Sequence, residues 1–326
     1  MKVARGTLRI GTRGSALALW QTERVRSLLA AAGYTTERVE IKTTGDLAAD
    51  VPLASIGSRA LFTKQIDDAL LERRVDLAVH SLKDLPTQLP DGIRIGAIGQ
   101  REDARDALVS RGQLQWQSVP EGAVIGTSSL RRRAQLLYHR PDLRVVDLRG
   151  NVDTRLAKLD SNSEWSAIVL ATAGLVRLGL ERRIGERLAP ELMLPAPGQG
   201  ALAVTVRDQD VDVATVVRTA MHDGLTGLRA LAERAFLAGL EGGCQVPIAA
   251  YAVIRTGERQ NVLQLHGRVV SPDGRAMVEG HQLGPVLTED EAAALGAALA
   301  TRLLGQGAGA ILAQSRNVLA PRITEP

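Results

Sequence analysis

The chain has 326 residues, enough for two or three domains of about 100–200 residues each. Hydrophobic residues make up 45% and charged residues 23%, which argues against a disordered, collagenous or coiled-coil chain. Only five of the 40 basic residues are Lys, which leaves 35 Arg, the better residue for forked binding of carboxylates or phosphates. The net charge of +4 is weak evidence for nucleic acid, so we expect no nucleic-acid partner.

Cysteine and histidine usage limits the kinds of site. Cys244 is the single cysteine, which excludes an intramolecular disulfide and a multi-cysteine metal site. The five histidines show no metal-ligand spacing, so we expect no metal. The N-terminus lacks an apolar signal region, and no run of about 18 apolar residues is present. We therefore expect a cytoplasmic protein without a membrane span.

Short apolar runs alternate with helical patterns over the first 220 residues. The pattern predicts strands at Leu8–Gly11, Val75–Val79, Val124–Gly126, Leu143–Leu148 and Ala167–Leu170. It predicts helices at Ala16–Ala32, Phe62–Glu72, Leu130–Tyr138 and Val152–Leu159. Strands that alternate with helices indicate βαβ units and a mostly parallel sheet.

A short internal repeat is visible. Ile10-Gly11-Thr12 and Ile125-Gly126-Thr127 each precede a serine-containing turn and a predicted helix. This favours two similar α/β domains, although a three-residue match also arises by chance. The Pro/Gly-rich run Leu194–Gly200 then predicts a hinge or crossover.

The remainder has a different character. A strand is predicted at Ala201–Val206, and a helical region at Val211–Leu240 with a break at Asp223-Gly224. Further on, the pattern predicts strands at Ile248–Ile254, Val262–Val270 and Ala276–Leu283 and a helix at Glu289–Leu304. The C-terminal part is therefore predicted to be an α+β domain with a small antiparallel sheet.

Hydroxyls and arginines gather where the predicted strands end, which is where ligands bind in open α/β sheets. These positions are Thr12-Arg13-Gly14-Ser15, His80–Asp84, Thr127-Ser128-Ser129 with Arg131–Arg133, and Arg149-Gly150-Asn151 with Arg155. Arginines in the first turn of a helix oppose its dipole, so we expect an anion to offset Arg131–Arg133. The alternative interpretation is a solvated basic helix start, capped by Ser128 or Ser129.

Three further residues carry two interpretations each. Asp84 could stabilise positive charge on a substrate or relay protons, or could be a local partner of Lys83. Cys244 follows a Gly-Gly turn, so it is either a covalent attachment point or a small buried side chain. His80 follows an apolar run and is more typical of packing at a strand end than of catalysis.

Segments spread over the chain together resemble the porphobilinogen deaminase family. They run in the family's order and read IGTRGSALALW (10–20), DLAVHSLKDLP (76–86), REDARDALVS (101–110), GTSSLRRRAQL (126–136), DLRGNVDTRLAKL (147–159), ATAGLVRLGL (171–180), LPAPGQGAL (194–202) and ERAFLAGLEGGCQVPI (233–248). The match covers most of the chain to about residue 250.

The resemblance implies an α/β fold with two doubly wound, periplasmic-binding-protein-like domains and a smaller α+β C-terminal domain. The expected domains are 1–100 with 200–219, then 105–195, then 223–326. It also implies a transferase that joins four porphobilinogen molecules onto a dipyrromethane primer, releases ammonia, and frees hydroxymethylbilane by hydrolysis. A monomer is expected.

The resemblance also assigns site residues. It implies that Cys244 holds the dipyrromethane cofactor through a thioether, and that Asp84 is the catalytic acid that stabilises an azafulvene cation. The implied cofactor-binding residues are Lys83, Asp84, Thr127, Ser128, Ser129, Arg131, Arg132, Arg155 and Gly243. The residues implied to bind substrate carboxylates are Arg13, Ser15, Arg149, Arg155 and Arg177.

One loop departs from the family. Many members read Gly-Gly-Lys-Gly-Leu-Phe where this chain has Gly57-Ser58-Arg59-Ala60-Leu61-Phe62. Two glycines are lost, which is expected to stiffen the loop. Ser55 and Gln65 replace a basic residue and a Glu that are common in the family.

Two other functions compete with the transferase as explanations of the sequence. A non-catalytic anion-binding protein on the same fold would explain the arginines but neither Cys244 nor Asp84. A nucleic-acid binder would need a steep salt dependence of affinity, and the charge distribution does not favour it.

Overall fold

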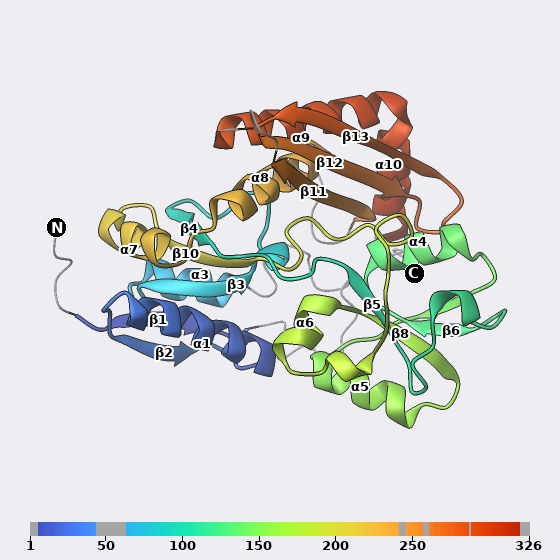
Figure 1. Ribbon diagram of the computed structural model, residues 1–326, viewed down its shortest axis with the longest axis horizontal. Coiled ribbons are helices and arrows are strands. Elements are labelled where there is room, and N and C mark those ends of the chain that lie inside the picture. Colours follow the sequence, from blue (N-terminus) through green and yellow to red (C-terminus); the bar gives the residue numbers. More distant parts are fainter. Residues whose placement is uncertain (1–5, 44–62, 241–245, 257–260, 287, 320–326) are drawn as a thin grey trace, which may run out of the picture.

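The computed structural model describes residues 6–43, 63–240, 246–256, 261–286 and 288–319. Within these residues the chain forms two five-stranded sheets and one three-stranded sheet, each with its own helices. Figure 1 shows the two larger sheets side by side, with the C-terminal sheet and its helices above them. This architecture confirms the predicted fold class.

The first sheet has four strands that run in one direction and one that runs against them. In spatial order the strands are β2 (Thr36–Glu40), β1 (Leu8–Thr12), β3 (Leu77–Ser81), β10 (Leu202–Arg207) and β4 (Ile93–Ile98). β1 is parallel to β2 and β3, whereas β10 is antiparallel to both β3 and β4. The chain therefore returns to this sheet, after visiting the second, through a reversed strand.

The second sheet repeats this topology. Its strands in spatial order are β7 (Arg144–Val146), β6 (Val124–Gly126), β8 (Trp165–Ala171), β5 (Asp106–Val109) and β9 (Ile184–Arg187). β6 is parallel to β7 and β8, and β5 is antiparallel to β8 and β9. β6 thus occupies the place of β1, and the short repeat in the sequence marks topologically equivalent turns.

The helices that follow these two strands begin in the same way. α1 (Ala16–Ala31) and α4 (Leu130–His139) each have a serine at the N-cap. Ser15 Oγ accepts from the Ala18 N–H at 3.3 Å, and Ser129 Oγ accepts from the Arg132 N–H at 3.4 Å. Each cap satisfies a backbone donor that the first helical turn leaves open.

Further helices cover the two sheets. They are α3 (Lys64–Leu71), α5 (Val152–Ser161), α6 (Thr172–Arg177) and α7 (Val211–Met221), with 3-10 turns at Leu82–Asp84, Trp116–Ser118 and Glu181–Arg183. The amphipathic faces of these helices close the cores; Val25 of α1 and Val217 of α7, for example, pack with Ile10 and Val204 of the first sheet. All four side chains are fully buried, which is worth roughly 1.5–3 kcal/mol for each such aliphatic side chain.

The C-terminal unit is an antiparallel sheet covered on one face by helices. Its elements are β11 (Ile248–Thr256), β12 (Asn261–Val270), β13 (Met277–Pro285), α8 (Gly224–Gly239), α9 (Glu289–Leu303) and α10 (Gly309–Leu319), the last two joined by a π-helical turn at Leu304–Ala308. Phe236 of α8 is fully buried against β12. A Cβ on Gly267 would lie within van der Waals overlap of the Phe236 ring, so only glycine fits there.

One helical stretch, Glu289–Ser315, is apolar and long enough to cross a membrane by length and composition alone. Its residues Ala292, Leu299 and Leu303 are buried in the core of the C-terminal sheet. A core helix of a globular unit meets the same test, so the stretch is weak evidence for a membrane span.

Several elements differ from the sequence prediction. β3 begins and ends two residues later than expected, so His80 and Ser81 belong to the strand. β7 is shorter than the predicted strand at 143–148. The pattern missed β2, β4, β5, β9, α6 and α10. β2 and β9 lie at sheet edges and are largely polar, so they lack the apolar run that marks a strand.

Two crossing segments, residues 99–105 and 195–201, connect the first and second sheets (Figure 1). They lie against each other: the Glu102 N–H donates to the Gly200 carbonyl at 3.0 Å. Gly200 has a φ of +88°, and a Cβ there would overlap the Glu102 carbonyl oxygen. Glycine at this position therefore allows the close approach of the two segments.

A buried ion pair ties the crossing segments to the C-terminal unit. Glu233 of α8 is fully buried and accepts from both Nη atoms of Arg101, at 2.6 and 3.1 Å. The same carboxylate accepts from the backbone N–H groups of Gly198 and Ala252, each at 2.7 Å. One side chain thus joins both crossing segments, α8 and β11, and its lone pairs are well satisfied.

We predict that Glu233→Gln lowers the free energy of unfolding by about 3–5 kcal/mol, because it leaves the Arg101 guanidinium buried without an opposite charge. Urea unfolding at neutral pH measures the change. The matched control is Glu289→Gln, since Glu289 pairs with Arg218 at 2.9 Å on the surface, where loss of the pair costs less than about 1 kcal/mol. Equal losses in the two variants would contradict the assignment.

Candidate functional site

Asp84 lies where β3 runs into the 3-10 turn Leu82–Asp84. Leu82 is fully buried, and its N–H donates to the Ala201 carbonyl at 3.0 Å, which fixes the turn against the second crossing segment. Asp84 is left exposed and Lys83 half-buried. The turn therefore carries an ammonium group and a carboxylate on consecutive residues, Lys83 and Asp84.

The Lys83 side chain reaches across to the second crossing segment. Its Nζ donates to Oε1 of Gln199 at 3.2 Å. Burial lowers the pKa of Lys83 to about 8, with Arg132 and Arg131 adding to the fall while Asp84 and Asp106 oppose it. The ammonium group is thus charged at neutral pH but loses its proton more readily than an ordinary lysine.

A small pocket of about 60 Å³ brings together residues from α1, β3 and the Asp84 turn. Its lining includes Arg13, Ser15, Leu17, Ala18, Gln21, Thr63, Val79, His80, Ser81 and Asp84. Two of the residues expected to bind substrate, Arg13 and Ser15, therefore share a pocket with the residue expected to be catalytic. Gln21 Nε2 donates to Ser81 Oγ at 2.8 Å and closes one wall.

His80 lines this pocket but has a structural role in the sheet. Its Nε2 lies 3.1 Å from Thr205 Oγ1 of the neighbouring strand β10, in the sheet interior. Burial, together with the positive charge of Arg13, lowers the pKa of His80 to about 4. The imidazole is therefore neutral at physiological pH and bonded to a core hydroxyl, which agrees with the packing interpretation.

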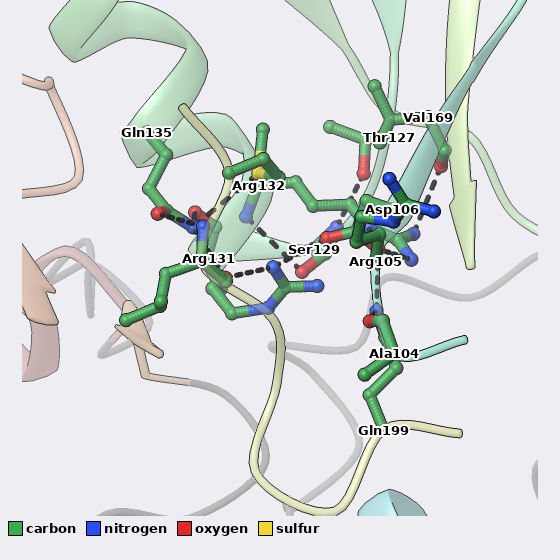
Figure 2. A network of polar contacts seen from close by, with 12 residues as sticks. Ala104, Arg105, Asp106, Thr127, Ser129, Arg131, Arg132, Gln135, Val169 and Gln199 are labelled. Carbon is green, nitrogen blue, oxygen red and sulfur yellow. Dashed lines mark hydrogen bonds and ion pairs between the residues drawn. The ribbon is translucent and has the colours of Figure 1, made fainter. Parts of the chain in front are cut away.

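The arginines of α4 meet a carboxylate of the protein itself. Arg131 Nη1 donates to Asp106 Oδ2 at 2.7 Å, and Arg132 donates to Asp106 Oδ1 from Nη2 at 2.7 Å and from Nε at 3.0 Å (Figure 2). Burial alone would raise the pKa of Asp106, but the two arginines outweigh it and hold that pKa well below its usual range. Asp106 is fully buried at the start of β5.

This geometry corrects one expectation from the sequence. We expected a bound anion to offset the cations in the first turn of α4, but Asp106 already supplies one negative charge against Arg131 and Arg132. Among the described residues, Arg131 donates from Nη1 to Asp106 and to the Leu194 carbonyl, each at 2.7 Å. Two charges against one leave a net positive cluster, so the region still favours an anionic ligand.

Arg155 of α5 is the clearest sign that a ligand belongs here. Its Nε is buried and has no hydrogen-bond partner in the described part of the chain. Burial lowers the pKa of Arg155 to about 10, and the charges of Arg132 and Arg149 lower it while Asp84 opposes them. Asp84 of the first half therefore lies within electrostatic reach of arginines of the second half. A buried donor without a partner costs free energy that a bound carboxylate would recover.

The hydroxyls at the end of β6 hold the turn that carries these arginines. Thr127 Oγ1 accepts from the Ser129 N–H at 3.2 Å, and Ser128 Oγ accepts from the Leu148 N–H at 2.9 Å. The second bond fixes the end of β7 beside the end of β6, just before Arg149. Each oxygen acts as an acceptor, so each O–H can still donate to an anion.

Arg177 differs from the other predicted substrate residues. Its Nη2 donates to the Gly200 carbonyl at 2.7 Å, and its guanidinium lies over the Trp20 ring, 5.6 Å from the centroid. Burial lowers its pKa, with Glu102 opposing the shift. Arg177, the last residue of α6, thus reaches toward α1 and the second crossing segment, and it already has protein partners in both.

Some predicted residues lie outside the described part of the chain. These are Cys244 and Gly243, and the loop residues Ser55 and Gly57–Phe62. Gln65 lies inside α3. Sequence reasoning missed Asp106 and Gln199, both buried. The available signals were a charged residue at the start of an apolar strand and a polar residue within a Pro/Gly-rich run.

Asp67 of α3 is a buried carboxylate. Within the described residues, no ion pair and no helix-cap hydrogen bond stabilises its charge. It is 3% exposed, and neither oxygen has a hydrogen-bond partner in the described residues. Burial raises the pKa of Asp67 to about 6, with the nearby Thr63 hydroxyl opposing the rise and the charge of Asp68 adding to it. Thr63, one helical turn earlier, lines the pocket of Asp84. Ionised Asp67 is therefore a destabilising group close to the site.

We predict that Asp67→Asn stabilises the protein at pH 8 and not at pH 4. The folded state binds the Asp67 proton more tightly than the unfolded chain, so wild-type stability falls as pH rises from about 4 to about 6 and stays lower above it, by about 3 kcal/mol. Urea unfolding across this range measures the difference between variant and wild type. Asp68→Asn, which removes an exposed partner of Lys64, is the control, and an identical pH dependence in both variants would contradict the assignment.

Distant matches among solved structures include a periplasmic substrate-binding protein and a lipoprotein. A periplasmic substrate-binding protein of an ABC transporter from Coxiella burnetii is 17% identical, with 67% of this chain and 92% of that chain covered and a TM-score of 0.41. A putative lipoprotein from Actinomyces odontolyticus is 15% identical, with 68% and 92% covered and a TM-score of 0.43.

Two family models match the chain itself. Residues 8–215 match the dipyromethane cofactor binding domain of porphobilinogen deaminase, and residues 227–305 match the C-terminal domain of the same enzyme. The first match spans the Asp84 turn, the arginines of α4 and α5, and both crossing segments. The chain therefore belongs to the porphobilinogen deaminase family, the hydroxymethylbilane synthases, which polymerise porphobilinogen on a dipyrromethane cofactor.

Proposed function

We propose that the net positive cluster around Arg131, Arg132 and Arg155 holds the acetate and propionate groups of dipyrromethane, and that Cys244 anchors this cofactor covalently. The Nε of Arg155 carries the proposal, because this buried donor has no hydrogen-bond partner among the residues that the structure describes and lies within electrostatic reach of Asp84, Arg132 and Arg149. When bound, dipyrromethane supplies the pyrrole carbon to which porphobilinogen is added.

The residues present fit a polyanionic pyrrole chain. The cofactor-binding set that we propose is Cys244, Gly243, Lys83, Asp84, Thr127, Ser128, Ser129, Arg131, Arg132 and Arg155. Guanidinium groups match the geometry of carboxylates, the hydroxyls of the β6 turn add O–H donors, and Lys83 adds a point charge. The acid among these cations is suited to pyrrole N–H groups, which are donors and would find no acceptor among arginines.

Asp84 is the catalytic residue in this proposal. It is exposed and lines the pocket with Arg13 and Ser15. Its carboxylate accepts pyrrole N–H groups and stabilises the positive charge that develops as ammonia leaves the substrate. We propose Arg13, Ser15, Arg149, Arg155 and Arg177 as the residues that bind substrate carboxylates; Arg177 would have to exchange a protein partner to do so.

The setting of the reaction follows from the small, anionic substrate. We propose that the enzyme works as a monomer in the cytoplasm, with porphobilinogen as its partner and without nucleic acid or a membrane.

The covalent anchor is tested by the intact mass of freshly purified protein beside Cys244→Ala. We predict a dipyrrole-sized excess and a colour with Ehrlich's reagent in the wild type, and neither in the variant, because only a thiolate can form the thioether. Cys244→Ser is a closer control for shape. A wild-type chain that stays unmodified after incubation with porphobilinogen would overturn the proposal and favour a non-catalytic anion-binding protein.

The role of Asp84 is tested by Asp84→Asn. Loss of a carboxylate that stabilises transition-state charge is expected to reduce product formation by a factor of about 10²–10³ or more, while the protein still folds because Asp84 is exposed. Stopped assays of hydroxymethylbilane formation measure the rate. Asp91→Asn, an exposed carboxylate on the turn before β4, is the control. Equal rates in Asp84→Asn and the wild type would refute the assignment.

A further inference from the structure

Gln199 of the second crossing segment bridges groups from the first and second sheets. Its Oε1 accepts from Lys83 Nζ at 3.2 Å. Its Nε2 donates to Asp106 Oδ1 at 2.9 Å and to the Ala104 carbonyl at 2.7 Å (Figure 2). The residue is 1% exposed. One buried amide thus joins the turn after β3, the first crossing segment and the start of β5.

The chemistry of the partners permits a single orientation of this amide. An ammonium group has only donors, and a carboxylate or carbonyl has only acceptors. The amide oxygen must therefore face Lys83 and the amide nitrogen must face Asp106. A flipped amide would place donor against donor and acceptor against acceptor in a buried position, which costs more than either hydrogen bond is worth.

No other side chain of similar size serves both partners. A glutamate would repel Asp106 and neutralise Lys83, and an asparagine is one methylene too short to reach both. A neutral, bifunctional amide leaves the charge of Asp106 for Arg131 and Arg132 and the charge of Lys83 for a ligand. Glutamine is the residue that links the two without using up either charge.

We propose that Gln199 is a positioning residue that fixes the Lys83 ammonium group against the Asp106–Arg131–Arg132 cluster, so that cations from both halves of the site face the same anionic ligand. Since the first and second sheets are joined by the crossing segments, the link also sets how far Lys83 lies from the arginines of α4. That these cations bind one anionic ligand rests on the proposed function. The hydrogen bonds of Gln199 to Lys83 and Asp106 do not depend on it.

The protonation state of Lys83 supplies a readout of the link. Asp84, Asp106, Arg131 and Arg132 are the charged groups that act on Lys83, and burial already lowers its pKa to about 8. An acceptor on Nζ stabilises the charged form. Loss of the Gln199 oxygen is therefore expected to lower the Lys83 pKa further, and a carboxylate in its place to raise it.

The experiment is competitive labelling of the holoenzyme with acetic anhydride between about pH 6 and about pH 11, read from the Lys83 peptide by mass spectrometry. We expect Gln199→Leu and Gln199→Asn to lower the Lys83 pKa by about one unit, a tenfold loss of proton affinity, and Gln199→Glu to raise it by about as much. The shorter Asn variant keeps the measurement usable if the Leu variant does not fold.

Gln135→Leu is the matched control. Gln135 is equally buried in the same network, and it bonds to the Arg131 carbonyl, to the Leu194 backbone and to Arg268 but not to Lys83. It is expected to destabilise the fold and to leave the Lys83 titration unchanged. A wild-type titration in Gln199→Leu, or an equal shift in Gln135→Leu, would overturn the proposal. Absence of dipyrromethane from the wild-type mass would instead overturn the proposed function.

Discussion

The arrangement of the site depends on the ion pairs that Asp106 makes with Arg131 and Arg132. The carboxylate is fully buried at the start of β5, and both guanidinium groups lie on the first turn of α4. Two like charges on a helix N-terminus repel each other and oppose the helix dipole, so an anion next to the turn stabilises it. A single internal carboxylate stabilises the pair and still leaves the cluster positive.

The repeated topology explains why the site lies between the two larger sheets. In each sheet the reversed strand is the one that the chain enters from a crossing segment, β5 in the second sheet and β10 in the first. Asp106 begins β5 directly after one crossing, and Gln199 lies in the other crossing, three residues before β10 begins at Leu202. The residues that connect the halves are therefore also the residues that position the cations. Glu233 ties the same crossings to the C-terminal unit.

The local elements of the site could be predicted from the sequence because their signals are local. The strand–turn–helix units at 8–31 and 124–139 combine an apolar run, a serine cap and an amphipathic helix, and the hydroxyls and arginines follow strand ends as expected. The strand–turn–helix units depend on residues that are close together in the chain. The meeting of Arg13 and Ser15 with Asp84 in the pocket depends instead on the parallel pairing of β1 with β3.

The features that the sequence did not predict depend on residues that are far apart in the chain. Asp106 meets α4 across 25 residues of sequence and Gln199 meets Lys83 across 116, so no periodicity links them. The resemblance assigned Arg177 to substrate carboxylates, but tertiary packing already gives it the Gly200 carbonyl and the Trp20 ring. The polar edge strands β2 and β9 are formed by pairing with neighbours rather than by their own apolar pattern.

The most direct test of this account is the intact mass and urea unfolding of Asp106→Asn beside Asp142→Asn, whose carboxylate pairs with Arg140 on the surface at 2.7 Å. If Asp106 organises the cluster that holds dipyrromethane, Asp106→Asn will lose about 3–5 kcal/mol of folding free energy and will be purified without the dipyrrole mass. The Asp142 variant will keep both. An Asp106→Asn protein with wild-type stability and the full dipyrromethane mass would contradict the account.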